Sequence, residues 1–273
     1  MLWLQRSELM KRFYDADHQR LIYIGHAATE EFWDSHWKTD DFRRAVTATP
    51  NSWVAKTTRR FLSKGSRVLE GGCGPANHVY ALQNQGFEAV GVDFAPKTVS
   101  LLKDAAPELD IRLGDVRSLP FENQSFDGYW SLGVIEHFWG GYQQIAEEMH
   151  RVLRKEGFLF LTFPAMTDIR VWKAKRGKYS IWQDGAREPD GFYQFALSSE
   201  ETIENFSKLG FDLVDQKGLD GLKGLKDEIS PLKMPLQKIY DSSAFLARTA
   251  KKVFNEASSS WCGHSWLIVL QKQ

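Results

Sequence analysis

The chain has 273 residues, of which 42% are hydrophobic and 26% are charged, so the bulk of it is expected to fold. Its 35 Lys and Arg balance 35 Asp and Glu, which argues against a protein that binds duplex nucleic acid mainly through phosphates. Two cysteines, Cys73 and Cys262, are too few for a disulfide framework or a four-cysteine zinc site, and no metal site is predicted.

The cellular location follows from the same composition. No apolar run approaches the roughly 18 residues that a membrane span needs. The first eight residues lack the long apolar stretch of a signal peptide. With so few cysteines, the sequence predicts a cytoplasmic protein without a membrane span.

Residues 1–64 are predicted to form a helical N-terminal cap. They are rich in charged and aromatic residues and contain no glycine between positions 26 and 64. Asn51 or Ser52 is expected to cap a helix that runs to about Ser63.

From residue 65 onwards the pattern alternates between strands and helices. Strands are predicted over 67–70, 88–93, 109–113, 125–131 and 157–163, and helices over 76–85, 95–106 and 139–153. Such alternation favours an α/β fold with a Rossmann-like, doubly wound, mostly parallel sheet. Ligands of these sheets bind at the carboxyl ends of the strands, so polar residues there are the first candidates for a site.

The segment after Pro164 is predicted to carry two inserts into a domain that spans 65–273. The first insert covers 165–197, and the second covers 218–256 with an exposed loop over 218–236 and a helix over 237–256. A helix over 198–209 and strands over 211–216 and 264–270 are expected around the second insert, with Ser198 or Ser199 as the cap of the helix.

A glycine-rich turn follows the first strand of the domain, with the sequence Glu70-Gly71-Gly72-Cys73-Gly74-Pro75. Gly72 and Gly74 permit a tight turn and a close approach of a ligand to the backbone. The next helix offers its N-terminal amides to a polar group. Taken alone, this turn fits NAD, FAD or S-adenosylmethionine.

Two acids end the following strands. Asp93, followed by Phe94, can accept hydrogen bonds from both hydroxyls of a ribose, and it can also cap the next helix. Asp115, followed by Val116, can accept a hydrogen bond from the exocyclic amine of an adenine. The fourth strand ends in the sequence Ser131-Leu132-Gly133-Val134-Ile135-Glu136-His137.

With these motifs in register, the chain resembles the class I S-adenosylmethionine-dependent methyltransferases, in the type 11 group that includes the ubiquinone and menaquinone enzymes. The resemblance covers about residues 66–164. It implies a seven-stranded sheet with an antiparallel last strand, and S-adenosyl-L-methionine as cofactor. The cofactor-binding residues that it implies are Glu70, Gly71, Gly72, Cys73, Gly74, Asp93, Phe94, Asp115, Val116 and Ser131.

The sequence signals for acceptor-binding residues are less specific than those for the cofactor. His137 is the candidate proton acceptor if a hydroxyl is methylated, although the same pair Glu136-His137 is common to methyltransferases of many substrates. Tyr193, Gln194 and His137 are expected to line the acceptor pocket. Tryptophans such as Trp3, Trp33, Trp37 and Trp53 either wall that pocket or pack in the cap.

A basic run also lies in the first insert. Five residues, Arg170, Lys173, Lys175, Arg176 and Lys178, either hold an anionic group of the acceptor or form a solvated face.

Three functions remain open from the sequence. The first is methyl transfer from S-adenosylmethionine to a small molecule by O-, N- or C-methylation. The second is a nicotinamide-dependent Rossmann oxidoreductase, which would share Gly72, Gly74 and Asp93 but has no natural use for Asp115. The third is a non-catalytic protein that binds S-adenosylmethionine. The expected partner is a small-molecule acceptor and not nucleic acid, and no oligomeric state is predicted.

Overall fold

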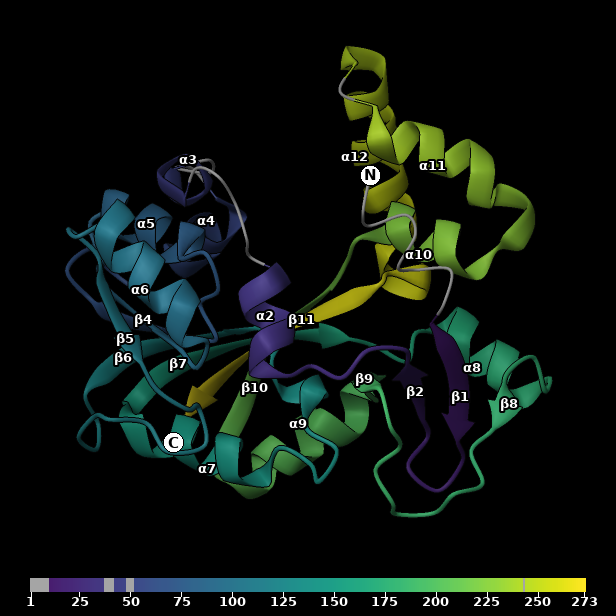
Figure 1. Ribbon diagram of the computed structural model, residues 1–273, viewed down its shortest axis with the longest axis horizontal. Helices are drawn as coiled ribbons and strands as arrows, with labels where there is room; N and C mark the ends of the chain where they lie inside the picture. The colour runs from purple at the N-terminus through teal and green to yellow at the C-terminus, as the bar shows by residue number, and fades with distance from the viewer. Residues whose placement is uncertain (1–9, 37–41, 48–51, 243) are drawn as a thin grey trace.

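A seven-stranded sheet organises the part of the chain that the computed structural model describes, residues 10–36, 42–47, 52–242 and 244–273 (Figure 1). Its strand order is β10-β11-β7-β6-β3-β4-β5. The strands are β3 (Arg67–Gly71), β4 (Glu88–Asp93), β5 (Asp110–Leu113), β6 (Phe126–Leu132), β7 (Leu153–Pro164), β10 (Phe211–Leu219) and β11 (Ser265–Lys272). Strand β11 lies antiparallel between β7 and β10, while β3 to β7 pair in parallel. The predicted mostly parallel sheet with an antiparallel last strand is confirmed.

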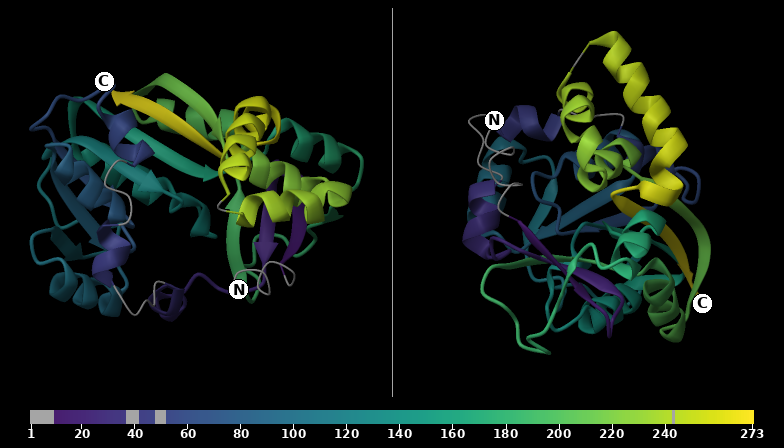
Figure 2. Two further views of the ribbon diagram at one scale, coloured as in Figure 1. Left: turned by 90° about the horizontal axis from the view of Figure 1, so that it is seen from above. Right: turned by 90° about the vertical axis from the view of Figure 1, so that its right-hand side faces the viewer.

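Helices cover both faces of this sheet. On one face lie α3 (Phe42–Thr47), α4 (Trp53–Thr58), α5 (Asn77–Asn84) and α6 (Pro96–Ala105), and on the other lie α7 (Gln143–Val152) and α9 (Ser199–Lys208) (Figures 1 and 2). Helix α7 begins later than predicted, because Gly140 and Gly141 interrupt the chain and Gly141 has a φ of +92°. At α9 the Ser198 side chain accepts a hydrogen bond from the Glu201 amide, so the predicted cap is confirmed.

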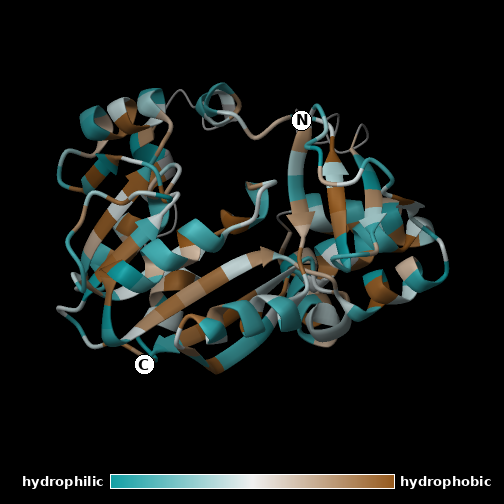
Figure 3. Ribbon diagram, turned by 90° about the horizontal axis from the view of Figure 1, so that it is seen from below, coloured by the Kyte–Doolittle hydropathy of each residue, from teal (hydrophilic) through white to brown (hydrophobic). Residues whose placement is uncertain are grey.

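Alternate residues of the central strands belong to two separate hydrophobic cores, one on each face of the sheet. Val68 of β3 packs towards α4 and α5, while its neighbour Leu69 packs towards α7, and both are fully buried. This alternation follows from the two-residue period of a strand, and burial on both faces explains the nearly continuous apolar runs that the strands show (Figure 3).

The predicted helical cap is wrong over residues 11–24. Strands β1 (Lys11–Asp15) and β2 (Arg20–Ile24) form a hairpin there, and they join β8 (Ser180–Ile181) and β9 (Phe192–Ala196) in a second sheet of order β8-β1-β2-β9. The hairpin is held in this sheet by β9, which pairs with β2 and lies about 170 residues further along the chain, and by β8, which pairs with β1. No local period reveals such a partner.

Short helices and turns make up the rest of the N-terminal region where it is described. Helix α2 (Glu30–His36) precedes α3 and α4. Ser52 caps α4 by accepting a hydrogen bond from the Ala55 amide, and α4 ends at Thr58, earlier than predicted. The other candidate cap, Asn51, and the tryptophans Trp3 and Trp37 lie outside the described residues.

The predicted loop over 218–236 is also wrong. Helix α10 (Gly221–Glu228), the short helix η2 (Ser230–Leu232), α11 (Lys233–Asp241) and α12 (Phe245–Cys262) occupy this region, after α8 (Asp168–Lys175) in the first insert. A Cβ atom on Gly224 would lie 1.6 Å from the Cys262 carbonyl oxygen, and one on Gly221 would lie 2.4 Å from Ser258 Oγ. These glycines therefore permit α10 to pack closely on α12.

Candidate active site

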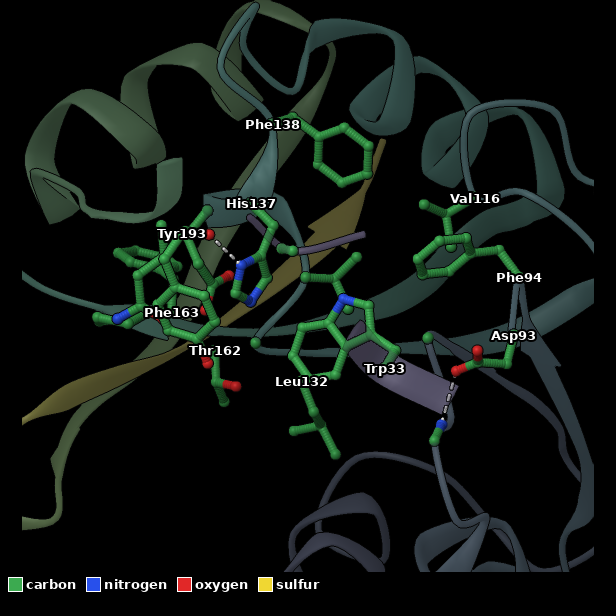
Figure 4. A pocket seen from close by; sticks show the side chains of 18 of the residues that line it. Trp33, Asp93, Phe94, Val116, Leu132, His137, Phe138, Thr162, Phe163 and Tyr193 are labelled. Carbon is green, nitrogen blue, oxygen red and sulfur yellow. Dashed lines mark hydrogen bonds between the residues drawn. The ribbon is translucent and has the colours of Figure 1, made fainter. Parts of the chain in front are cut away.

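A cavity of about 520 Å³ opens at the carboxyl ends of β3, β4 and β6 (Figure 4). The chain reverses its direction of travel across the sheet between β3 and β6, so the cavity lies at the topological switch point where doubly wound sheets bind ligands. Its wall combines predicted cofactor residues with residues from α2, β7, β9 and β11. They are Ala28, Trp33, Gly72, Gly74, Asp93, Phe94, Gly114, Asp115, Val116, Arg117, Leu132, Gly133, Val134, Glu136, His137, Phe138, Thr162, Phe163, Pro164, Tyr193, Gln194, His264 and Ser265.

The glycine turn has the backbone that only glycine adopts easily. Gly72 has a φ of +74° and Gly74 a φ of +48°. A Cβ on Gly72 would lie 2.6 Å from Val134 Cγ2, so the turn also packs directly against the segment that follows β6. The two strand ends thereby form one continuous wall.

Asp93 is buried at the end of β4 and organises the turn. Its Oδ2 accepts a hydrogen bond from the Gly74 amide at 2.8 Å, and its Oδ1 accepts one from the Ala95 amide at 2.9 Å. Burial raises the pKa of Asp93, and these amides partly oppose the rise. Because a carboxylate offers about four lone-pair sites, it retains acceptor capacity for ribose hydroxyls while it caps the chain.

Asp115 and Val116 line the same cavity beyond β5. Asp115 pairs with Arg117 through a 2.6 Å contact, and this hydrogen-bonded guanidinium lowers the pKa of the carboxyl. Phe94 also lines the cavity and is 42% exposed, which leaves an aromatic face open to a ligand.

Four of the predicted cofactor residues are buried behind the cavity and do not line it: Glu70, Gly71, Cys73 and Ser131. Gly71 admits Tyr129, since a Cβ there would lie 2.1 Å from the Tyr129 hydroxyl. Burial raises the pKa of the Cys73 thiol well above its usual value, in keeping with a packing role. Among the described atoms, Glu70 Oε2 and Ser131 Oγ have no hydrogen-bond partner.

The opposite wall carries the predicted acceptor residues His137, Tyr193 and Gln194. His137 Nδ1 lies 2.6 Å from the Tyr193 carbonyl oxygen, which can only accept, so Nδ1 carries the proton and Nε2 keeps its lone pair. Burial lowers the pKa of His137 to about 4, although carbonyl contacts oppose this, so the ring is neutral at neutral pH. Trp33 of α2 meets the imidazole edge-on, with ring centroids 5.2 Å apart (Figure 4).

Several wall residues were not predicted as site residues, and two of them, Glu136 and His264, are titratable and lie near the proposed acceptor residues. Glu136 was seen as part of a motif, but its burial against the cavity depends on the turn of η1 (Ile135–His137) and is not visible in the sequence. His264 precedes β11 and reaches the cavity because β11 inserts beside β7. A strand that inserts between two others carries its first residues to the site, which could have drawn attention to His264.

The basic run does not act as one unit. Arg170 and Lys173 turn inwards to Glu228 of α10, and Arg170 also contacts His264 Nδ1 at 3.2 Å. Lys175, Arg176 and Lys178 are exposed. Neither prediction for the run therefore holds for Arg170, which is fully buried. Within the described ranges, no group of three or more His, Cys, Asp or Glu side chains could hold a metal ion.

The geometry is that of a Rossmann-like methyltransferase, and comparison with known proteins agrees. The family model described as "Methyltransferase domain" matches residues 69–161. A protein of Mycolicibacterium smegmatis named a probable S-adenosylmethionine-dependent methyltransferase is 29% identical over 163 residues, covering 60% of this chain and 58% of that protein. The demethylmenaquinone methyltransferase of Staphylococcus epidermidis is 30% identical over 168 residues, covering 59% of this chain and 67% of that enzyme.

A solved structure supports the fold alone. The S-adenosylmethionine-dependent methyltransferase from Archaeoglobus fulgidus superposes with a TM-score of 0.52 at 15% identity, covering 89% of this chain and 98% of that one.

The chain belongs to the S-adenosylmethionine-dependent methyltransferases, and its cofactor is S-adenosyl-L-methionine. The cavity suits this cofactor, because Gly72 and Gly74 in its wall have left-handed conformations and leave the backbone open to a ligand. Just before the glycine turn, at the end of β3, the buried Glu70 carboxyl has an oxygen with no hydrogen-bond partner in the described part of the chain. No described helix is long and apolar enough to cross a membrane.

Proposed function

We propose that this protein transfers the methyl group of S-adenosylmethionine to a small-molecule acceptor bound in the same cavity. One observation carries the proposal. The cavity that begins at Gly72, Gly74 and Asp93 continues without interruption to a wall of Trp33 and Tyr193, which belong to no cofactor motif. A donor and an acceptor can therefore meet in one cavity, as an in-line displacement requires.

The predicted cofactor residues keep their roles in this proposal. Asp93 receives the ribose, Asp115 and Val116 border the adenine, Phe94 offers a stacking face, and the region of Glu70 holds the amino group of the methionine moiety. When bound, the cofactor supplies an activated methyl group on a positively charged sulfur. The protein contributes alignment of that group and exclusion of water.

His137 is part of the proposed acceptor side. Because its pKa of about 4 keeps the ring neutral, Nε2 is available to accept a proton or a hydrogen bond from the acceptor at neutral pH. The Tyr193 carbonyl fixes the ring in one tautomer.

Aromatic side chains make up much of this wall, which favours a flat or apolar acceptor over a nucleic acid. Both cysteines are buried and unpaired, and this supports the proposed cytoplasmic location.

Two experiments test the proposal. The first is a calorimetric titration with S-adenosylhomocysteine and, in parallel, with NADH. Micromolar binding of the first alone is expected, and binding of NADH alone would refute the cofactor. The second adds S-adenosylmethionine carrying a labelled methyl group to a lysate with the protein. Label in the small-molecule fraction is expected. Label only in RNA or protein would refute a small acceptor, and tight binding without any transfer would indicate the non-catalytic alternative.

A further inference from the structure

The carboxyl group of Glu136 is buried in the wall of the cavity without a partner for one of its oxygens. Glu136 is 2% exposed and lies in η1, directly after β6. Its Oε1 lies 3.4 Å from the position of a Cβ on Gly133. No described residue forms a hydrogen bond with its Oε2. Buried polar groups are normally paired, so such an oxygen at a ligand site calls for a function.

In the described part of the chain, burial and not a neighbouring charge has the largest effect on the pKa of this carboxyl. The titratable groups that face it are Tyr193 of β9 and its own neighbour His137, while β7 contributes the uncharged Thr162 and Phe163. Burial raises the pKa of Glu136 to about 8, and burial together with Glu136 raises the pKa of Tyr193 to about 12. At neutral pH in the free protein, Glu136 is therefore largely protonated.

The carboxyl lies between the two ends of the cavity, since it raises the pKa of Tyr193 on the proposed acceptor wall and belongs to the segment that packs on the glycine turn. The segment that carries it begins with Gly133 and Val134, and the Val134 methyl group fills the space beside Gly72 in the glycine turn. Glu136 thus borders the place where the strand ends of β3 and β6 meet. An in-line displacement requires the methyl group to meet the acceptor where the two ends of the cavity join, so the positive sulfonium of the donor is expected in that region.

We propose that Glu136 is the carboxyl that recognises the sulfonium, exchanging its proton for the positive charge of the methyl donor. The inference rests on the proposed function, since it requires S-adenosylmethionine in this cavity. On binding, the carboxylic acid loses one proton to the buffer and becomes a carboxylate beside the sulfonium. No covalent bond to the cofactor forms, and the methyl group stays on sulfur until the acceptor takes it.

The demethylated product is the natural control, because S-adenosylhomocysteine has the same nucleoside and amino acid but a neutral sulfur. Protons released by Glu70 or Asp93 would accompany both ligands, since both ligands carry the amino group and the ribose. Only a group that responds to the sulfonium releases an extra proton with S-adenosylmethionine. The difference between the two ligands therefore isolates the proposed contact.

The test is calorimetry of both ligands at pH 7 in buffers of different ionisation enthalpy, which counts the protons released. A carboxyl with a pKa of about 8 is about 90% protonated at pH 7, so S-adenosylmethionine should release about 0.9 proton more than S-adenosylhomocysteine. Because binding lowers the pKa of Glu136, affinity for S-adenosylmethionine should rise with pH up to about 8 and then level off, whereas the affinity for S-adenosylhomocysteine should not share this rise.

Glu136→Gln keeps the shape of the neutral side chain and should not destabilise the free protein at neutral pH. It should abolish the difference in proton release and weaken S-adenosylmethionine binding at pH 8 by roughly tenfold, while S-adenosylhomocysteine binding changes by less than about twofold. Glu147→Gln, on the exposed face of α7, is the matched control and should change neither quantity.

Three outcomes would count against the inference. Equal proton release for both ligands in the unaltered protein would overturn it. A difference that survives in Glu136→Gln would assign the proton to another group and also overturn it. Failure of both ligands to bind would overturn the proposed function itself, and with it the inference.

Discussion

Glu228 is expected to be a major electrostatic determinant of stability, because its buried carboxylate forms ion pairs with three basic side chains. Its Oε1 accepts hydrogen bonds from Arg12 at 2.7 Å and from Arg170 at 3.0 Å. Its Oε2 accepts from Lys173 and from the Tyr179 hydroxyl, both at 2.7 Å. The side chain has no exposed surface. These contacts join β1, α8 and α10.

The magnitude follows from the pKa. Burial alone would raise the pKa of Glu228, but the neighbouring Arg170 and Arg12 lower it from 4.5 to about 2. Since one pKa unit corresponds to 1.36 kcal/mol, the ionised group contributes about 3 kcal/mol to the free energy of unfolding at pH 7. A lowered folded-state pKa means that this stability is complete above pH 4.5 and declines as the pH falls towards 2.

Glu228→Gln removes the charge and leaves Arg170 buried without its counter-ion, so we expect a loss of about 3–5 kcal/mol at pH 7. Urea denaturation at pH 7, 5, 4 and 3 measures it. The difference in unfolding free energy between the unaltered protein and Glu228→Gln should fall by about 2 kcal/mol between pH 7 and pH 3, because Glu228 is progressively protonated over that range.

The control is Glu256→Gln, whose carboxylate lies 3.8 Å from Lys252 with its side chain 68% exposed. We expect this variant to lose less than about 0.5 kcal/mol of unfolding free energy. A loss of unfolding free energy below about 1 kcal/mol for Glu228→Gln at pH 7, or a loss that does not change with pH, would refute the electrostatic reasoning.

Three other predictions follow from single contacts. Asp93→Ala should weaken S-adenosylhomocysteine binding by about a hundredfold, because two hydrogen bonds to a charged acceptor are lost; an affinity within fivefold in calorimetry would contradict its ribose role. Gly224→Ala should lower the unfolding free energy by more than about 2 kcal/mol in urea, because its Cβ would meet the Cys262 carbonyl oxygen at 1.6 Å, whereas Gly140→Ala, with open space around it, should be nearly neutral. Thr58→Val should lower the unfolding free energy by about 1–3 kcal/mol, because it leaves the buried Trp130 indole N–H, now 2.8 Å from Thr58 Oγ1, without an acceptor; Thr58→Ser should restore most of the loss.

The sequence predicts the large sheet well because each of its strands is defined locally. Runs such as 157–163 are apolar nearly throughout, and turns with glycine or proline separate them from amphipathic helices. Asp93 and Asp115 were found for the same reason. They follow strands directly, and parallel strands bring their carboxyl ends to one edge.

The second sheet and the α10–α12 region were missed because their determinants are distant in sequence. Strand β2 pairs with β9, and the glycines of α10 are explained by the Ser258–Cys262 end of α12, not by a turn. A glycine that permits close packing and a glycine that permits a turn look alike until the partner is known. Arg170 is a similar case, because its counter-ion Glu228 lies 58 residues away.

The two ends of the cavity differ in the same way, one defined by local sequence and the other by distant segments. The cofactor end is built from consecutive strand ends, so a local motif specifies it. The proposed acceptor end is built where β9, α2 and the residues before β11 converge, and only tertiary contacts place them together: Trp33 against His137, Tyr193 against the same ring, and His264 against Arg170. Because Arg170 also contacts Glu228, the cation cluster that stabilises α8 and α10 reaches the wall of the cavity through His264. Substitutions in α8 or α10 can therefore disturb this wall of the cavity through His264 while they leave Asp93 and the glycine turn in place.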